Sequence, residues 1–405
     1  MLVCGLYFEV HYFAILMLLS VIIVNYNVKY FLEQCLCSVR KAIGELAMTR
    51  GENSVEVIVV DNQSTDGSIE YLQPRFPFVR FIASHVNLGF SKANNLALQQ
   101  ATGQYILFLN PDTILPEDAF VKCTRFMDAH ADAGALGVYM VDGAGQYLKE
   151  SKRGFPSLWV SFCKMTGLTR WFPSSKLFAG YYLGHLSSQH IQIVDVLSGA
   201  FMMVKKQALE KTGGFDEQFF MYAEDIDLSY RLQKAGFTNY YLPECRIIHF
   251  KGESTRKNSR YVKQFYRAMV QFVQKHHHGE LAWLYTGLLE AMIWLRAAIT
   301  VVSREHAAHS IPYTGTPRFL LAGDERSKKE VRSVLASFPG YTITDNPDEA
   351  REWIFCEGYT YSFRQIIEQL QSCPTWLKAF IHAGGTYTVV GSQSSDQRGY
   401  VIAMD

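Results

Sequence analysis

Acidic side chains follow two apolar runs in the first third of the chain. Asp61 comes directly after Val55–Val60, and Asp112 comes shortly after Tyr105–Leu109. A continuous run of branched apolar residues is typical of a strand that is buried on both faces. In open α/β sheets, ligands bind just beyond the carboxyl ends of such strands. We therefore predict a site for ribose hydroxyls, a base N–H, or a divalent metal that carries phosphates, because all three bind carboxylates.

The bulk composition is that of an ordinary globular protein. The chain has 405 residues, a formal net charge of +1, 48% hydrophobic residues and 19% charged residues. This length favours two or three domains, each with room for its own core. The balanced charge argues against nucleic acid as a partner. The eight cysteines include no C-x-x-C pair, which favours buried free thiols in a reducing compartment.

The strands that position Asp61 and Asp112 belong to an alternating pattern over residues 18–115. The pattern predicts strands at 20–24, 55–60, 78–82 and 105–109, separated by helices at 30–48, 68–72 and 91–100. Strands that alternate with helices indicate an α/β fold with a doubly wound, mostly parallel sheet and right-handed crossovers. A further helix is predicted at 116–130, where Pro116 stands at the first position.

Beyond residue 134 the pattern is mixed. Residues 150–190 are rich in aromatics, Gly and Pro without a clear period, so we expect long loops that shape a variable substrate pocket. A strand is predicted at 198–204, and a helix at 222–235 that Gly236 ends.

Five motifs follow one another at 59–68, 87–95, 109–112, 213–228 and 248–254. In this order they resemble the motifs of inverting family 2 glycosyltransferases with the GT-A fold. The resemblance covers about residues 18–255, and the chain is most similar to the bacterial branch of rhamnosyltransferases in surface-polysaccharide assembly. The resemblance implies transfer of a sugar, with inversion, from a UDP- or dTDP-linked nucleotide-diphosphate sugar. The implied acceptor is a saccharide or a lipid-linked saccharide.

The resemblance implies nucleotide-binding roles for five residues of the first half. Asp61 would accept hydrogen bonds from a base N–H or a ribose hydroxyl; alternatively it caps the turn that follows its strand. Lys92 lies where it could contact the diphosphate, although a solvated surface lysine is an equal alternative. The full set is Tyr26, Asp61, Asn87, Lys92 and Asp112.

A metal site is implied at Asp112 and His249. Mg²⁺ or Mn²⁺ takes one or two protein carboxylates and fills its other positions with phosphate oxygens and water. The family pattern is Asp-x-Asp, but here its first position is Asn110, which leaves Asp112 as the one carboxylate of the motif. We therefore expect weak metal affinity in the absence of nucleotide. His249 taken alone could equally be a structural residue.

The catalytic candidates are Asp225 and Glu224. Displacement at an anomeric carbon needs a carboxylate that accepts the proton of the attacking hydroxyl, and we assign this role to Asp225. Glu224 would orient the acceptor, and Asp227 would cap the helix or pair with a cation. Acids in a first helical turn also interact favourably with the helix dipole, but this alternative leaves the neighbouring aromatics unexplained. Those suited to stacking on a sugar ring are Phe219, Phe220, Tyr222 and Tyr230.

The remaining regions complete the predicted organisation. Residues 1–17 are a possible upstream extension, because Met17 would be a natural start just before the first strand. Residues 18–258 would form the GT-A domain, 259–312 a helical, membrane-associating segment, and 317–405 a Rossmann-like accessory domain that docks or regulates.

The apolar stretch 281–303 supports the membrane surface as a partner. It is long enough to span, but Glu290 and Arg296 would be costly inside a bilayer. Its tryptophans suit a helix lying in the interface, and packing on protein is a third alternative. We expect a peripheral or monotopic protein at the cytoplasmic face of the inner (plasma) membrane.

Two other functions compete with this assignment. A sugar-1-phosphate nucleotidylyltransferase needs a Gly-rich, basic loop after the first strand, where this chain has Asn25–Val28. A non-catalytic GT-A scaffold, whose tail docks partners, is the alternative; the presence of Asp112, Asp225 and His249 argues against it.

Overall fold

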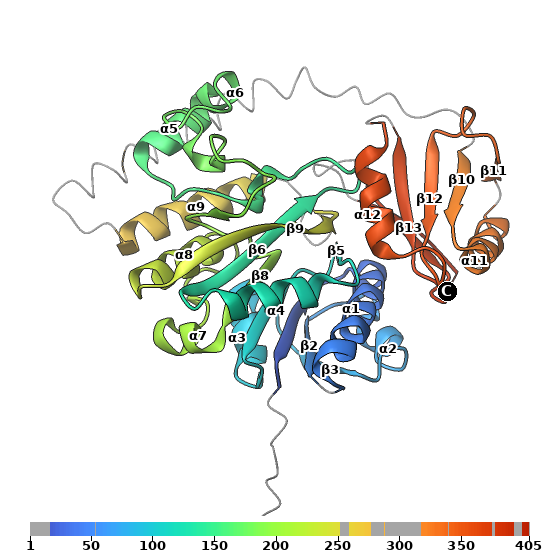
Figure 1. Cartoon of the computed structure of the whole chain (residues 1–405), viewed down its shortest axis with the longest axis horizontal. Helices are drawn as coiled ribbons and strands as arrows, with labels where there is room; N and C mark the ends of the chain where they lie inside the picture. The colour runs from blue at the N-terminus through green and yellow to red at the C-terminus, as the bar shows by residue number, and fades with distance from the viewer. Residues whose placement is uncertain are drawn as a thin grey trace, which may run out of the picture.

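The computed structural model of the chain describes residues 17–52, 54–251, 259–276, 287, 317–338, 340–374, 377–392 and 399–404. These residues form a nine-stranded sheet in the larger, N-terminal part and a six-stranded sheet in the tail (Figure 1). The predicted extension lies outside the described residues, except for Met17. The stretch 281–303 also lies outside them, except for Gly287.

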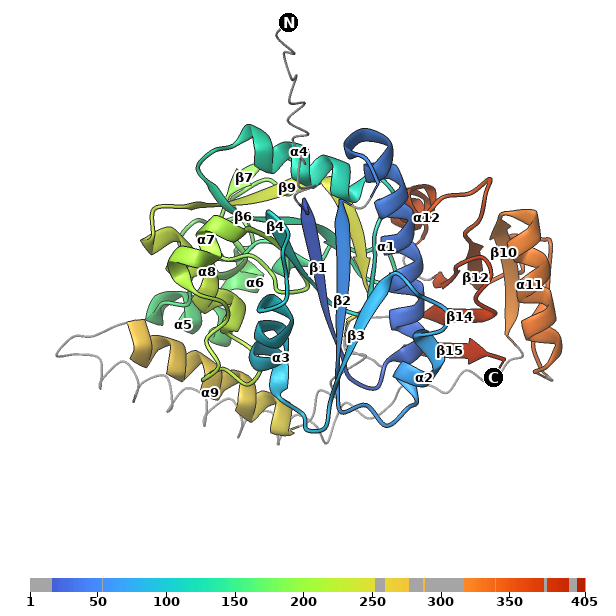
Figure 2. The ribbon, with the colours of Figure 1, turned by 90° about the horizontal axis from the view of Figure 1, so that it is seen from below.

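The first half of the large sheet is the parallel unit that the alternating pattern predicted. Its strands lie in the order β3-β2-β1-β4, and all neighbouring pairs are parallel (Figure 2). The strands are β1 (Leu19–Asn25), β2 (Val55–Asn62), β3 (Val79–Ser84) and β4 (Tyr105–Leu109). The connecting helices are α1 (Lys29–Arg50), α2 (Ser68–Leu72) and α3 (Gly89–Leu98).

The second half of the sheet is mixed. Strand β8 (Phe201–Lys205) runs antiparallel to both β4 and β6 (Ala133–Val141). Strand β9 (Thr238–His249) pairs in parallel with β6 and antiparallel with the short β5 (Thr113–Ile114) and β7 (Gln192–Ile193). Helix α4 (Ala119–Ala129) follows β5. The prediction of a mostly parallel α/β sheet is confirmed.

Strands β6 and β9 were not predicted. Their register shifts between Val138 and Tyr139, where β9 contains Pro243. Proline cannot donate a ladder hydrogen bond and is confined to edges, strand starts or bulges. The irregularity therefore interrupts the alternation that would have identified β9 in the sequence.

Residues 150–190 are not the long loops that we expected. They contain the helices α5 (Leu158–Thr166) and α6 (Leu168–Trp171) and the 3₁₀ turns η1 (Lys149–Ser151) and η2 (Gly180–Tyr182). The Ser157 hydroxyl caps α5 by accepting from the Val160 N–H, and Gly167 ends the helix with φ of 83°. Both are standard helix boundary signals, which the aromatic-rich composition obscured.

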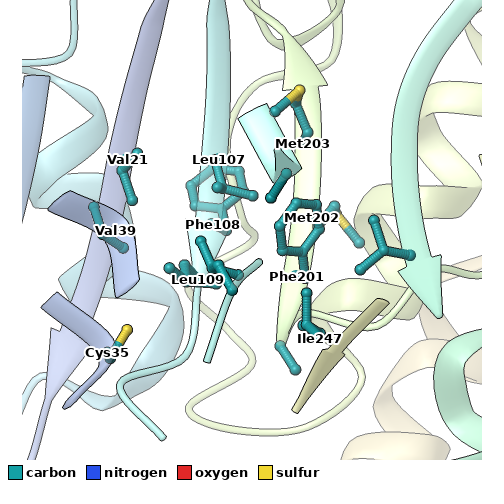
Figure 3. Close-up of a cluster of buried hydrophobic side chains, with 14 of the residues drawn as sticks. Val21, Cys35, Val39, Leu107, Phe108, Leu109, Phe201, Met202, Met203 and Ile247 are labelled. Atoms are coloured by element: carbon teal, nitrogen blue, oxygen red, sulfur yellow. The ribbon is translucent and has the colours of Figure 1, made fainter. Parts of the chain in front are cut away.

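The neighbouring strands β4 and β8 contribute buried side chains to the central core. Figure 3 shows Leu107, Phe108 and Leu109 beside Phe201, Met202 and Met203. All six are buried, and full burial of such a side chain contributes about 1.5–3 kcal/mol. This packing holds the carboxyl end of β4 beside the start of β8.

Helices α7 (Lys206–Thr212), α8 (Glu224–Lys234) and α9 (Ser259–His276) complete the larger part. The apolar face of α9 packs on helix α8 and its preceding loop, through Ala268, Met269, Phe272 and Val273. The part of 259–312 that is described thus buries its apolar face against protein. Among the described residues, no helix combines the length and the apolar character needed to cross a bilayer.

The tail is an α/β unit, as predicted. Its sheet has the order β11-β10-β12-β13-β14-β15, parallel up to β13 and antiparallel beyond it. The strands are β10 (Arg318–Gly323), β11 (Thr342–Ile343), β12 (Glu352–Cys356), β13 (Lys378–His382), β14 (Thr388–Gly391) and β15 (Tyr400–Ala403). The helices are α11 (Glu325–Ala336) and α12 (Phe363–Ser372).

The tail lies against α1, as both ribbon views show. The amide of Gln34 donates to Thr388 Oγ1 at 2.7 Å and accepts from the Ala383 N–H at 2.7 Å. Glu33 accepts from the Thr388 hydroxyl at 2.7 Å, and Lys41 pairs with Glu357 at 2.9 Å. Side chains of α1 therefore contact the tail just past the carboxyl ends of β12 and β13.

Candidate active site

Asp61 lies where β2 ends, directly opposite Asn25 of β1. Its Oδ1 accepts from Asn25 Nδ2 at 2.7 Å, and its Oδ2 accepts from the Ser64 N–H at 3.0 Å. The carboxylate therefore braces the turn after β2, as the capping alternative proposed. Each oxygen of a carboxylate has two acceptor sites, so the same group retains capacity for a ligand.

Tyr26 stands in the loop after β1, and its side chain is 36% exposed. The next residue, Asn27, has φ of 56°, a conformation that Asn adopts more readily than most residues. Its N–H donates to Ser64 Oγ at 3.0 Å, and its Oδ1 accepts from the Thr65 N–H at 2.7 Å. The loops after β1 and β2 are thus tied together around Tyr26.

Asn87 is held at the same sheet edge by Asn62, a residue that sequence reasoning did not select. Asn62 Nδ2 donates to Asn87 Oδ1 at 3.1 Å, and Asn62 Oδ1 accepts from the Leu88 N–H at 2.7 Å. Its position in the sequence could have identified it, because Asn62 directly follows Asp61. Lys92 lies on α3 and is exposed, which leaves both of its predicted alternatives open.

The loop before α8 contacts the loop before α3. The Phe90 N–H donates to the carbonyl oxygen of Phe220 at 2.7 Å. A Cβ at Gly89, whose φ is 77°, would lie 2.5 Å from that same oxygen. Glycine is therefore required here, both for the left-handed backbone and for the close approach of the two loops.

Asp112 and His249, the two residues predicted to bind a metal, lie next to each other. His249 Nε2 lies 3.4 Å from Asp112 Oδ1 and 3.3 Å from Asn110 Nδ2. Both side chains are buried, and Asp112 Oδ1 and His249 Nδ1 lack hydrogen-bond partners within the described part of the chain. Buried polar atoms are normally paired, so these two atoms fit a site that a ligand completes. The described residues contain no group of three or more acidic, His or Cys side chains that could hold a metal by themselves.

Asp225 lies at the start of α8 and is buried beside Arg153. Its Oδ2 forms an ion pair with Arg153 Nη2 and accepts from the Gly199 N–H at 3.2 Å. Burial alone would lower the pKa of Arg153, but the Asp225 carboxylate raises it overall, so the guanidinium stays charged. Sequence reasoning missed Arg153, because it lies 72 residues away in the segment that we expected to be loops.

Glu224 is in a different environment from its neighbour. It is buried, and its Oε2 has no hydrogen-bond partner in the described structure. Burial first, and then the adjacent Asp225 carboxylate, raise the pKa of Glu224 to about 8. Glu224 is therefore mostly protonated at neutral pH and can donate a hydrogen bond, whereas Asp225 has a cationic partner.

The backbone that leads into α8 is strained. Tyr222 and Ala223 adopt left-handed conformations, with φ of 71° and 66°. Such conformations cost about 1–3 kcal/mol each for non-glycine residues and gather at functional sites. They turn the chain so that Glu224 and Asp225 begin the helix beside Gly199.

Two of the aromatic residues predicted to stack on a sugar belong to the core instead. Phe219 is buried, and Tyr230 packs edge-on against Phe155 and Phe272. Phe220, at 47% exposure, stays available. The prediction for Phe219 and Tyr230 was wrong because α9, which covers them, lies far along the sequence.

Asp227 pairs with cationic side chains, which is one of the two roles that the sequence predicted for it. It is fully buried and accepts from Arg231, Lys275 and His276 at 2.6–2.7 Å. These bonds attach the end of α9 to α8.

A short path joins the carboxylates of α8 to those at the ends of β2 and β4. Asp225 accepts from the Gly199 N–H, and the next residue, Ala200, accepts from the Asn110 N–H at 3.0 Å. Asn110 in turn contacts His249. The predicted proton acceptor and the predicted metal ligands therefore lie at one edge of the sheet.

Comparison with known proteins agrees with the motifs. The model of the family described as glycosyl transferase family 2 matches residues 20–212. The chain is similar to N-acetylglucosaminyl-diphospho-decaprenol L-rhamnosyltransferase of Mycobacterium tuberculosis, with 29% identity over 67% of this chain and 90% of that protein. It is also similar to rhamnosyltransferase WbbL of Escherichia coli, with 31% identity over 42% of this chain and 63% of that protein.

Among solved structures, the chain is similar to a mannosyltransferase from Pyrobaculum calidifontis that was determined with GDP-Man and Mn²⁺. The identity is 19%, the TM-score is 0.46, and the likeness covers 73% of this chain and 76% of that one. The family match rests instead on residues 20–212, which hold the β-strand ends described above. Residues 20–212 of this chain are thus similar to glycosyl transferase family 2, and the two relatives named above are rhamnosyltransferases.

Proposed function

We propose that the chain transfers a hexosyl or deoxyhexosyl group from a UDP- or dTDP-linked sugar to a saccharide or lipid-linked saccharide. The transfer proceeds with inversion and serves the biosynthesis of cell-surface polysaccharide. One observation carries the proposal: Asp225, which pairs with Arg153, is connected to the metal-binding candidates by a short series of hydrogen bonds. Asp225 accepts from Gly199, the next residue Ala200 accepts from Asn110, and Asn110 contacts His249.

The nucleotide would bind along the ends of β1, β2 and β4. Asp61 has free acceptor capacity toward a base N–H or ribose hydroxyl, and half-exposed Tyr26 offers an aromatic face beside it. Asn87 closes this edge through its contact with Asn62, and exposed Lys92 offers a positive charge for the diphosphate.

A divalent metal, Mg²⁺ or Mn²⁺, fits Asp112 and His249. An oxygen and a nitrogen ligand, both buried and both with an unpaired atom, suit an ion that takes its remaining ligands from a diphosphate and water. When bound, the ion would neutralise the charge of the leaving diphosphate. With two such protein ligands, the site should bind metal weakly until the nucleotide arrives.

Asp225 is the proposed base. The acceptor hydroxyl gives its proton to the Asp225 carboxylate while its oxygen bonds to the anomeric carbon, and the bond to the diphosphate breaks on the opposite face. Arg153 forms an ion pair with Asp225 and holds its carboxyl group in place, while the raised pKa of neighbouring Glu224 favours a protonated side chain that can donate a hydrogen bond to the acceptor. Two carboxyl groups in unlike environments thereby take unlike roles.

A lipid-linked acceptor at the cytoplasmic face of the plasma membrane is supported by two observations. By its name, the Mycobacterium tuberculosis relative acts on a decaprenol-linked saccharide. The described cysteines are free rather than bridged, as expected in a reducing compartment. We propose a peripheral association with that membrane.

The test is a panel of UDP-, dTDP- and GDP-linked sugars, assayed for transfer with and without Mn²⁺ or Mg²⁺. We expect turnover with a UDP- or dTDP-linked sugar that stops when the metal is chelated. The Asp112→Ala variant should lose metal-dependent nucleotide binding in calorimetry, while the exposed-site variant Glu45→Ala should retain it. No transfer and no hydrolysis with any donor would favour the non-catalytic scaffold.

A further inference from the structure

The α5–α6 region displays a cluster of exposed aromatic and aliphatic side chains. Trp171 is 77% exposed, and the others are between 40% and 59% exposed: Trp159, Phe162, Phe172 and Leu177. Large apolar groups gathered in this way mark an interaction site more often than chance exposure. In Figure 1, α5 and α6 lie at the periphery of the molecule, on the side away from α1 and α2.

The same region has a one-sided charge. Between Glu150 and Asp195 the sequence contains no acidic residue, although the whole chain has 39 basic and 38 acidic residues. Arg170 and Lys176 are exposed next to the apolar side chains. The five basic residues of this interval are Lys152, Arg153, Lys164, Arg170 and Lys176. The apolar side chains of this surface suit the hydrocarbon interior of a membrane, and the basic residues at its edge suit anionic groups at the membrane surface.

The exposed side chains are held in place by contacts within the region. Trp159 donates from Nε1 to the Leu177 carbonyl at 2.8 Å, and its ring stacks on Phe162 at 5.7 Å between centroids. Thr169 donates to the Phe178 carbonyl at 2.8 Å. These contacts hold the Trp159 ring beside Phe162 and join both α5 and α6 to residues 177–178.

The region is attached directly to the proposed base. Arg153, which precedes α5, pairs with Asp225, and Lys152 donates to the Leu183 carbonyl at 2.8 Å. Tyr181 of η2 is hydrogen-bonded by both Arg153 and Lys164. A surface held by α5 and α6 is therefore at a fixed separation from Asp225.

We propose that the α5–α6 surface docks on an anionic phospholipid bilayer and so presents Asp225 to the headgroup of a lipid-linked acceptor. The inference rests on the proposed function, because a bilayer is needed only if the acceptor is embedded in one. Tryptophan is enriched at the interface between water and hydrocarbon. Exposed arginine and lysine beside it attract anionic headgroups.

The test measures binding of the full chain to vesicles by co-sedimentation. The wild-type protein should sediment with phosphatidylglycerol–phosphatidylcholine vesicles and much less with phosphatidylcholine alone. The double variant Trp171→Ala/Phe172→Ala should lower the partition coefficient between vesicles and water about tenfold. The double variant Arg170→Glu/Lys176→Glu should lower it about fivefold or more for each residue changed. The matched controls Tyr359→Ala and Lys329→Glu alter exposed residues of the tail and should bind as the wild type does.

A second measurement separates this inference from the proposed function. With a short-chain, water-soluble acceptor, both variants should transfer at the wild-type rate; with acceptor in vesicles, they should be slower in proportion to lost binding. Unchanged vesicle binding in both variants overturns the inference, even where transfer itself is intact. The inference is also overturned if the variants have a lower Tm or a different oligomeric state than the wild type but bind vesicles equally well. In that case the surface would serve as an interface with another part of the protein or with a second copy.

Discussion

At the scale of single residues, the site depends on the unlike surroundings of Asp225 and Glu224. Asp225 is buried next to a guanidinium and a backbone N–H, and its Oδ2 contacts both. Glu224 is buried next to a carboxylate, and its Oε2 has no hydrogen-bond partner among the described residues. Neighbours in the sequence thus have unlike surroundings because their side chains point to different partners.

The first prediction concerns Asp225→Asn. The amide cannot accept the proton of the acceptor, so kcat should fall by about 10²- to 10⁴-fold, while nucleotide affinity measured by calorimetry stays unchanged. The variant leaves Arg153 buried without its counter-charge, which should lower the free energy of unfolding by about 3–5 kcal/mol. Adding Arg153→Met should restore most of that stability but none of the activity. Full turnover by the Asn variant would remove Asp225 from the mechanism.

The second prediction concerns the pH dependence that Glu224 contributes. Its pKa is about 8 in the folded protein and near 4.5 as a free side chain, so its contribution to stability is complete below pH 4.5 and is lost as the pH rises through 8. Glu224→Gln cannot ionise. In urea unfolding at pH 5 it should nearly match the wild type, and at pH 9 it should be more stable by on the order of 4 kcal/mol. The exposed control Glu45→Gln should show no such trend; a parallel pH profile in both variants would contradict the assignment.

At the scale of elements, α9 holds the start of α8 in place. Phe272 is buried among Phe155, Tyr230 and His276, and Asp227 of α8 accepts from the last residues of α9. The strained Tyr222–Ala223 backbone needs such support, because strained conformations persist only where surrounding packing imposes them.

The third prediction tests this support with Phe272→Ala. Loss of a buried phenyl ring costs about 3–5 kcal/mol, so α9 should lose amide hydrogen-exchange protection while β1–β4 retain theirs. Transfer should fall together with the protection of residues 219–226. The exposed change Arg267→Ala on the same helix is the control. If α9 stayed fully protected in the Phe272 variant, α9 would not be the element that secures α8.

At the scale of the whole molecule, the tail and the catalytic part share one continuous apolar core. Phe363, Ile366 and Ile367 of α12 belong to the same buried cluster as the strands of the large sheet. Glu117, just before α4, accepts from the N–H groups of Phe363 and Arg364 and so caps α12 from the other domain. We propose that the tail serves as a docked module rather than as a second active site.

The fourth prediction is that the chain unfolds as one unit. Calorimetry of the wild type should show a single transition, because α12 and part of the tail sheet share a buried cluster with the large sheet, although the tail also has a smaller cluster of its own. The variant Gln34→Ala/Glu117→Ala removes hydrogen bonds across the interface and should lower the free energy of unfolding by about 3 kcal/mol. Glu368→Ala, an exposed change on α12, should leave Tm unchanged. Two separate transitions in the wild type would show that the tail is an independent domain.

The sequence by itself determined the elements whose signals are local. The bounds of β4 and α2 agree with the predicted ranges to the residue, because the first is an unbroken apolar run and the second is a short helix between clear turn residues. It also determined that carboxylates stand at strand ends, since strand direction and the position of Asp61 and Asp112 follow from the alternating order.

The tertiary structure alone decided which of those residues meet. Arg153 reaches Asp225 across 72 residues, and the pKa of Glu224 depends on burial by segments that no local pattern connects to it. Phe219 and Tyr230 became core rather than sugar platforms because α9 covers them. Periodicity reports the burial of a residue within its own element, whereas desolvation and ion pairing depend on elements that arrive from elsewhere in the chain.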